Sequence, residues 1–187
     1  MKTIIFIALF ALSCAYIYAQ PTDPKKVVDR DYNVAFMPGG GYSFFVPKAQ
    51  DSLGILSGGV IEFLLFGKVA QNDDFGPSHV RLYGKLNILK SSKKNVTDFF
   101  FYGIGLDMSI ERNPKRDFLI PYFGLEMGGL SNKIFGTTLQ FTPTVGVHLL
   151  SKKNIFLNVQ AGYMYPINNF EMLRGTAIQA GLNFSLW

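Results

Sequence analysis

The residues of this sequence that could do acid–base chemistry are two histidines and a scattered set of carboxylates. His148 lies in a segment of alternating polarity, and Glu126 occupies the same polar face of the preceding segment. A carboxylate that orients an imidazole, with a Ser or Thr as nucleophile, is the arrangement of a hydrolase. The alternative, which we favour, is a histidine that only forms hydrogen bonds inside the fold. His79 opens another segment of this kind and is interpreted as an interface residue.

Other short motifs do not predict a cofactor or a metal site. Asp29 with Asp31, and Asp73 with Asp74, are acidic pairs, but neither has the ligand count of a calcium loop. Three successive glycines at 39–41 lack the following helix that a phosphate-binding loop requires. The single cysteine, Cys14, lies in the N-terminal apolar segment. We therefore expect no metal, no cofactor and no thiol chemistry.

The N-terminal segment predicts export. Lys2 precedes an apolar run over 4–18, interrupted only by Ser13, and a small residue, Ala19, follows. The run is too short to span a bilayer comfortably, so we interpret residues 1–19 as a signal peptide cleaved after Ala19. Loss of Lys2 leaves 17 basic residues against 13 acidic ones, a modest excess that does not favour nucleic-acid binding.

The elements that must position these side chains are β-strands. Between 137 and 149 the odd positions are mostly apolar and the even ones polar or small, which is the period-two pattern of a strand with two unlike faces. The same pattern, broken by turn-forming residues, predicts strands near 33–47, 56–69, 79–90, 98–111, 118–129, 136–150, 154–166 and 174–187. No connection is long enough for a crossover helix, so all neighbours should be antiparallel. Closure into an up-and-down barrel removes the unpaired edges.

Two prolines on the apolar face, Pro121 and Pro143, complicate this pattern. Proline cannot donate a hydrogen bond to its neighbour in a ladder, and a closed barrel has no free edge to hold it. We expect local bulges at both positions.

The polar face predicts the inside of a narrow barrel. It carries Gly, Thr, Ser, Asn and Gln rather than the Lys and Glu of a water-exposed strand, and small residues suit a crowded lumen. Charges of both signs occur on this face and are expected to pair across the lumen, because an isolated buried charge costs several kcal/mol. The predicted luminal network is Glu62, Lys68, Arg81, Lys85, Asp107, Glu111, Glu126 and His148.

Aromatic residues gather near the ends of the predicted strands and favour a membrane setting. They lie at Tyr42 and Phe44, 99–102, 118–122, 163–165 and Trp187, as in the interfacial girdle of a membrane barrel. Strands of about 13 residues, tilted by about 40°, reach a height of roughly 30 Å, enough for an apolar band of about 25 Å. A secreted soluble barrel that binds a hydrophobic ligand, with its apolar face inward, is the competing arrangement.

The last strand resembles a known signal. Residues 176–187, reading TAIQAGLNFSLW, are similar to the C-terminal strand of bacterial outer-membrane β-barrels of about eight strands, with the architecture of the OmpA and OmpX proteins and a Bacteroidota-type sequence. The resemblance implies recognition by the barrel-assembly machinery through Leu182, Phe184, Leu186 and Trp187. Trp187 has the opposite parity to the apolar face, so either Leu186 takes the terminal outward position or the strand ends in a bulge.

The resemblance implies a short periplasmic segment at 20–32, a barrel at 33–187, and residence in the outer membrane of a Gram-negative bacterium. The implied partners are outer-membrane lipid, the assembly machinery and other envelope proteins. Short predicted connections argue against an adhesin, and a filled eight-stranded lumen argues against a diffusion porin. We therefore expect a non-enzymatic structural or accessory barrel. The alternatives are a lipid-modifying barrel enzyme and the soluble barrel.

Overall fold

The computed structural model describes residues 35–68, 79–109, 111, 116–152 and 154–185. The predicted signal peptide at 1–19, the segment at 20–32, and Leu186 and Trp187 lie outside these residues. Whether Leu186 takes the terminal outward position or the strand ends in a bulge therefore stays a prediction from the sequence.

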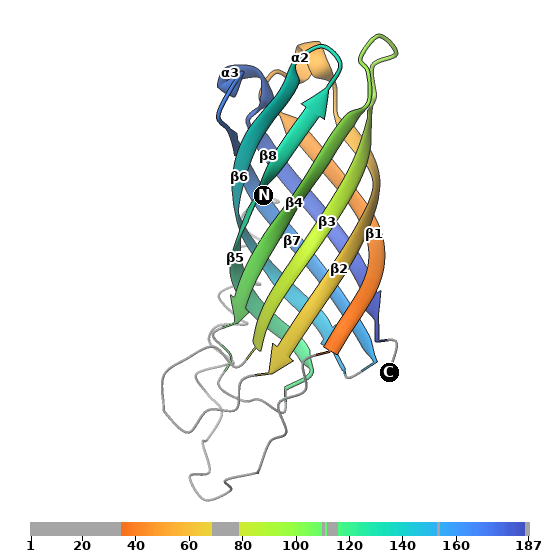
Figure 1. Cartoon of the computed structure of the whole chain (residues 1–187), viewed down its shortest axis with the longest axis vertical. Coiled ribbons are helices and arrows are strands. Elements are labelled where there is room, and N and C mark those ends of the chain that lie inside the picture. The colour runs from red at the N-terminus through yellow and green to blue at the C-terminus, as the bar shows by residue number, and fades with distance from the viewer. Residues whose placement is uncertain (1–34, 69–78, 110, 112–115, 153, 186–187) are drawn as a thin grey trace, which may run out of the picture.

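Eight antiparallel strands form one closed barrel in sequential order, with β1 paired to β8. The strands are β1 (Ala35–Pro47), β2 (Leu56–Lys68), β3 (His79–Ser91), β4 (Phe99–Ser109), β5 (Phe118–Asn132), β6 (Gly136–Ser151), β7 (Ile155–Pro166) and β8 (Gly175–Phe184). Figure 1 shows the tilted strands and, at the upper end of the barrel, two one-turn helices, α2 (Gln50–Leu53) and α3 (Phe170–Leu173). The predicted all-β, up-and-down architecture is confirmed. No helix in the described part of the chain is long and apolar enough to cross a membrane.

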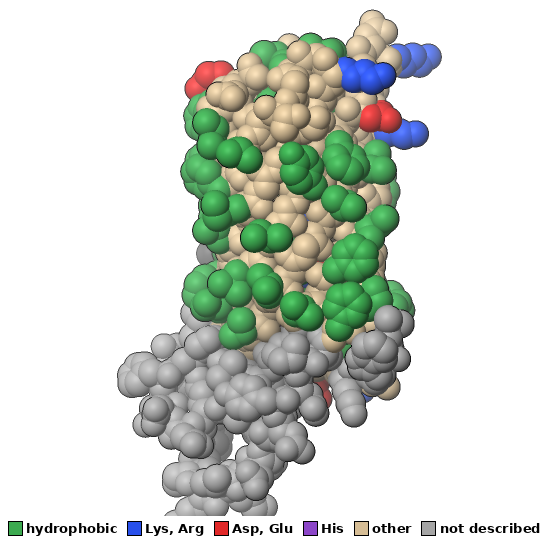
Figure 2. Space-filling model, viewed as in Figure 1, with side chains coloured by type: hydrophobic (Ala, Val, Ile, Leu, Met, Phe, Trp, Pro, Cys, Tyr) green, Lys and Arg blue, Asp and Glu red, His purple; other side chains and the backbone are tan. Residues whose placement is uncertain are grey.

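The apolar face of the strands points outward. Ile104 is 65% exposed and Met127 59%, whereas the luminal residues Glu62, Arg81 and Asp107 are 1% exposed each. Figure 2 shows apolar side chains distributed over the barrel wall, with Lys, Arg, Asp and Glu near its upper end. A soluble barrel would require the reverse arrangement, so that alternative does not fit the structure.

Part of the predicted aromatic girdle is on the outer face and part is not. Tyr42, Phe44, Phe100, Tyr102, Phe118 and Tyr163 are exposed on the outside. Phe99, Phe101 and Tyr122 are buried inside the barrel, and the prediction was wrong for these three. Phe99 and Phe101 alternate with the outward Phe100 and Tyr102, because successive residues of a strand face opposite sides. Tyr122 lies on the luminal face of β5 with Glu126, whereas Phe118 is exposed at the start of that strand.

Inside the barrel, the upper layer is apolar. It consists of Phe45, Leu53, Leu56, Leu89, Phe99, Phe101, Leu130, Met164 and Leu173. Leu53 of α2 and Leu173 of α3 close this layer from above. The two turns that carry the helices are joined, since the Lys48 amide donates to the Arg174 carbonyl at 2.7 Å and the Lys48 ammonium pairs with Glu171 at 2.8 Å.

The expected bulges at the two prolines are absent. The register between β5 and β6 is unchanged through Pro121, which pairs with Val147, and through Pro143, which pairs with Leu125. Pro121 is also buried rather than exposed on the outer face. The register shift lies instead between His148 and Leu150, in the pairing of β6 with β7. On the side of β7, the pairing omits Thr142 and Pro143 between the pairs Phe141–Tyr165 and Thr144–Gly162 without a change of register, so Pro143 lies in a local gap of that ladder rather than at a bulge.

Candidate functional site

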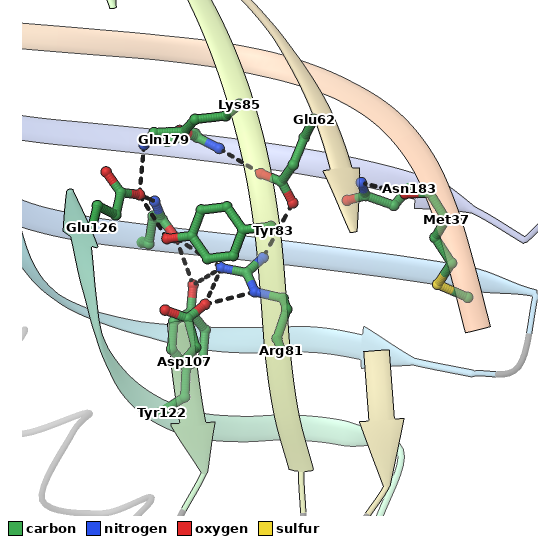
Figure 3. Close-up of polar contacts among 11 residues, drawn as sticks. Met37, Glu62, Arg81, Tyr83, Lys85, Asp107, Tyr122, Glu126, Gln179 and Asn183 are labelled. Carbon is green, nitrogen blue, oxygen red and sulfur yellow. Dashed lines mark hydrogen bonds and ion pairs between the residues drawn. The ribbon is translucent and has the colours of Figure 1, made fainter. Parts of the chain in front are cut away.

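A polar network fills the middle of the barrel, and Arg81 of β3 is at its centre (Figure 3). The Arg81 Nε donates to Asp107 Oδ2 at 2.6 Å, and an Nη of Arg81 is also paired with that carboxylate. The guanidinium also donates to Gln160 Oε1 at 3.0 Å and to Glu62 Oε1 at 3.4 Å. Because an arginine offers five N–H donors in a planar fork, one side chain can connect four strands here.

Glu126 of β5 is the second centre of the network. Its Oε1 accepts from Lys85 Nζ at 2.5 Å, from Tyr83 Oη at 2.7 Å and from Gln160 Nε2 at 2.7 Å. Gln160 therefore links the two centres, since its amide oxygen accepts from Arg81. Charge-assisted hydrogen bonds of this kind are stronger than neutral ones. The carboxylate is thus held by three donors from β3 and β7, two strands that do not pair with β5.

Gln179 of β8 closes the ring of contacts. Its Nε2 donates to Glu62 at 3.0 Å, and its Oε1 accepts from Lys85 at 3.1 Å. Residues of β2, β3, β4, β5, β7 and β8 therefore meet in the lumen. Buried charges are tolerated when each is paired and hydrogen-bonded, and this condition is met by contacts across the barrel rather than along one strand.

Two glycines make room for the aromatic rings of this network. Tyr83 is the ladder partner of Gly105, and Tyr122 is the ladder partner of Gly146. A Cβ at Gly105 would overlap the Tyr83 ring, and a Cβ at Gly146 would lie 2.5 Å from Cζ of Tyr122. Each ring thus covers its glycine. The guanidinium of Arg81 lies over the Tyr83 ring at 4.3 Å, which adds a cation–π contact.

The network leaves little space inside the barrel. A cavity of about 20 Å³ remains between it and the apolar upper layer, with Lys85, Asn87 and Thr144 among its lining residues. This volume suffices for about one water molecule. The Asn87 Oδ1 and Thr144 Oγ1 atoms are buried without a protein partner, and a water in this cavity would satisfy such atoms.

The structure brings together five of the eight residues predicted for the luminal network: Glu62, Arg81, Lys85, Asp107 and Glu126. Glu111 is also buried; it lies beyond the end of β4 at Ser109 and pairs with Arg116 of the following connection at 2.8 Å. The backbone of Lys68 pairs with His79 at the end of β2, but its side chain lies outside the description.

His148 is luminal, as predicted, but Glu126 does not orient it. Its ring stacks on Tyr122 with centroids 4.1 Å apart and contacts Phe156 at 4.7 Å, and its Nδ1 has no hydrogen-bond partner. His148 pairs with Ile120 of β5, six residues from Glu126 and so about 20 Å along the strand. The two residues share a face but not a height, and the suggested catalytic pair does not form.

His79, interpreted from the sequence as an interface residue, is buried inside the barrel. Its ring Nδ1 lies 3.3 Å from the Ser109 hydroxyl, and its backbone amide donates to the same hydroxyl at 3.1 Å. Tyr83, Tyr122, Gln160 and Gln179 are network residues that the sequence analysis did not select. Their parity could have identified them, because each shares the polar face of its strand. Within the residues described, no group of three or more His, Cys, Asp or Glu side chains could hold a metal ion.

Comparison with known proteins supports the fold alone. No protein-family model matches this chain, and no curated protein matches it significantly. Among solved structures, the crystal structure of Neisserial surface protein A is similar, with a TM-score of 0.52 and 19% sequence identity. The match covers 84% of this chain and all of the Neisserial chain. The barrel architecture is therefore shared with a bacterial surface protein, whereas the OmpA and OmpX likeness and the Bacteroidota-type origin remain predictions.

Proposed function

We propose that this chain is an integral outer-membrane barrel of a Gram-negative bacterium, with a structural or accessory role in the envelope and no enzymatic activity. The observation that carries the proposal is the distribution of polarity. Exposed apolar side chains cover the barrel wall, while the network charges of both signs are enclosed in the lumen. Such a wall is stable in hydrocarbon and would aggregate in water.

The filled lumen supports a role without transport. Arg81, Glu126 and their partners occupy the middle of the barrel, and the apolar layer closed by Leu53 and Leu173 occupies its upper end. An eight-stranded barrel filled by side chains has no aqueous channel. The signal peptide at 1–19 and insertion by the barrel-assembly machinery are part of the proposal and depend on the sequence alone.

The experiment that tests this proposal measures which face contacts lipid. Val145 of β6 is 48% exposed and its neighbour Thr144 is 4% exposed, with no hydrogen bond to its hydroxyl. In vesicles, a small fluorophore on Val145→Cys should be quenched by nitroxides on lipid chains. Thr144→Cys should react with a maleimide only after unfolding. A fluorophore on Lys93→Cys, in the upper turn, should escape quenchers located deep in the bilayer.

Failure of the Val145→Cys label to be quenched, with the protein recovered from the aqueous phase, would contradict the membrane assignment. The enzymatic alternative has its own test at His148. We expect His148→Ala cells to have an unchanged lipid A composition, because the ring lies between Tyr122 and Phe156 inside the barrel. Loss of a lipid A acyl modification in this variant would instead identify an enzyme.

A further inference from the structure

The upper end of the barrel, which carries α2 and α3, faces the cell exterior in the membrane arrangement proposed above. β1 begins and β8 ends at the opposite, lower end (Figure 1). The segment at 20–32, which we expect to be periplasmic, precedes β1, so the lower end belongs to the periplasmic side. The upper half of the wall then lies in the outer leaflet, which in a Gram-negative bacterium consists of lipid A, a phosphorylated and acylated disaccharide.

The upper end has an excess of basic side chains (Figure 2). Six basic residues stand against three acidic ones in its turns and at the adjoining strand positions: Lys48, Lys90, Lys93, Lys94, Lys133 and Arg174 against Asp51, Asp98 and Glu171. Among the strand residues whose side chains the structure describes, Lys90 of β3 is the single charged residue that points outward. It is exposed, and the ion pairs of the described part of the chain do not include it. A cation one residue before the upper end of β3 lies where headgroups begin, and it favours an anionic headgroup.

A groove on the outer wall begins beside this lysine and extends toward the middle of the barrel. Its volume is about 600 Å³, within the range of about 300–1,000 Å³ that ligand sites occupy. Gly59 of β2 forms its floor, since a Cβ built there meets nothing within 4 Å. The ladder partners of Gly59, Tyr42 on β1 and Ile88 on β3, form its sides, and Ile61 and Leu86 continue it downward. The groove therefore runs from the headgroup level toward the membrane midplane, as an acyl chain does.

The upper end of the groove is polar. Ser57 is the direct ladder partner of Lys90, so the hydroxyl and the ammonium emerge side by side on the same face. Tyr42 Oη donates to Ser57 Oγ at 3.2 Å, which leaves the hydrogen of Ser57 available to another acceptor. A cation and a hydroxyl donor at the head of an apolar groove match a lipid that carries a phosphate above its acyl chains.

We propose that this groove binds one molecule of lipid A from the outer leaflet, with an acyl chain over Gly59 and a phosphate held by Lys90 and Ser57. This inference rests on the proposed membrane location. The exposed Lys93 and Lys94 of the following turn add positive potential above the groove, where the sugars and the second phosphate lie. A second copy of this chain suits the groove less well. A two-fold axis along the membrane normal would bring two Lys90 ammonium groups together at the same height.

The test is lipid retention by the full-length mature barrel, measured by native mass spectrometry during titration. The probes are lipid A with both phosphates, dephosphorylated lipid A with the same acyl chains, and phosphatidylglycerol. We expect the wild type to retain one phosphorylated lipid A and to prefer it to the other two. Lys90→Gln should weaken binding of phosphorylated lipid A by about fivefold and lower its preference over the dephosphorylated form by the same factor. Gly59→Leu should weaken the binding of both forms by about tenfold, because it fills the floor of the groove.

Two matched variants separate the site from general effects. Lys133→Gln removes an exposed lysine of the same end, in the turn between β5 and β6, that does not line the groove. Gly84→Leu adds the same volume as Gly59→Leu at another outward glycine, where a Cβ has no neighbour closer than 3.9 Å. Both should bind as the wild type does. Equal losses in Lys90→Gln and Lys133→Gln, no retained lipid A in the wild type, a preference for phosphatidylglycerol, or a dimer that Gly59→Leu dissociates would each overturn the proposal.

Vesicle insertion and migration on an unheated gel are measured on the same samples. A barrel that inserts but retains no lipid A refutes the groove assignment alone, whereas a barrel that does not insert refutes the proposed function as well. The orientation has its own measurement, because Lys94→Cys on intact cells should react with a maleimide on a polymer too large to cross the outer membrane. Reaction only after permeabilisation would place this end in the periplasm and overturn the lipid A site, while the membrane assignment would stand.

Discussion

Replacing Arg81 with methionine is expected to destabilise the folded barrel by about 3–5 kcal/mol, the usual cost of removing one partner from a buried ion pair. Most of this loss comes from Asp107, which accepts the 2.6 Å hydrogen bond from Nε and has a side chain that is fully buried. The 3.4 Å contacts to Glu62 and Tyr122 are longer and contribute less. Methionine retains much of the packing against Tyr83, so the change isolates the charge.

The assay is reversible denaturant unfolding in lipid vesicles, followed by circular dichroism and by migration on unheated gels. The double variant Arg81→Met with Asp107→Asn should recover about 2 kcal/mol or more of the loss, because it no longer leaves a buried carboxylate without its cation. Lys48→Met, which removes an exposed ion pair with Glu171, should leave the free energy of unfolding close to that of the wild type. An Arg81→Met barrel as stable as wild type, or a double variant no better than the single one, would refute the reasoning.

Three further predictions concern packing, charge and conduction. Gly105→Ala should cost about 1–3 kcal/mol by displacing Tyr83 from Glu126, measured by the same unfolding assay, whereas Gly84→Ala should be nearly neutral. The hydrogen bond from Lys48 lowers the pKa of Glu171. The pair therefore stabilises the upper turns above the ordinary pKa of glutamate, and this stabilisation is lost as the pH falls through the lowered pKa. In Lys48→Met, an NMR titration should show a higher pKa for Glu171. Planar bilayers containing the barrel should show no ion conductance, and steady single-channel currents would contradict the sealed lumen.

Most of the fold could be predicted because its signal is local. Alternation along each strand and turn residues between strands gave six of the eight strands to within about two residues at each end, and antiparallel closure followed from the short connections. The C-terminal boundaries of β5 and β8 were less accurate. β5 extends to Asn132, three residues beyond the predicted limit, and β8 ends at Phe184, three residues before it. Hydrogen bonding across the ladder, which periodicity does not report, decides where a strand ends.

The site was only partly predictable, because parity gives the face of a residue but not its neighbours across the lumen. Parity placed Glu126 and His148 on the same face, and their separation along β5 follows only from the register of β6. The pairing of Arg81 with Gln160 joins β3 to β7, strands that are not neighbours in the barrel. Such contacts depend on the diameter and stagger of the closed sheet, which no single strand contains.

The contents of the lumen also indicate where this protein can meet other molecules. The interior is occupied by the network around Arg81 and Glu126 and by the apolar layer beneath Leu53, so the charged groups of the network are already bound to each other. Recognition is therefore left to the outer wall and the turns.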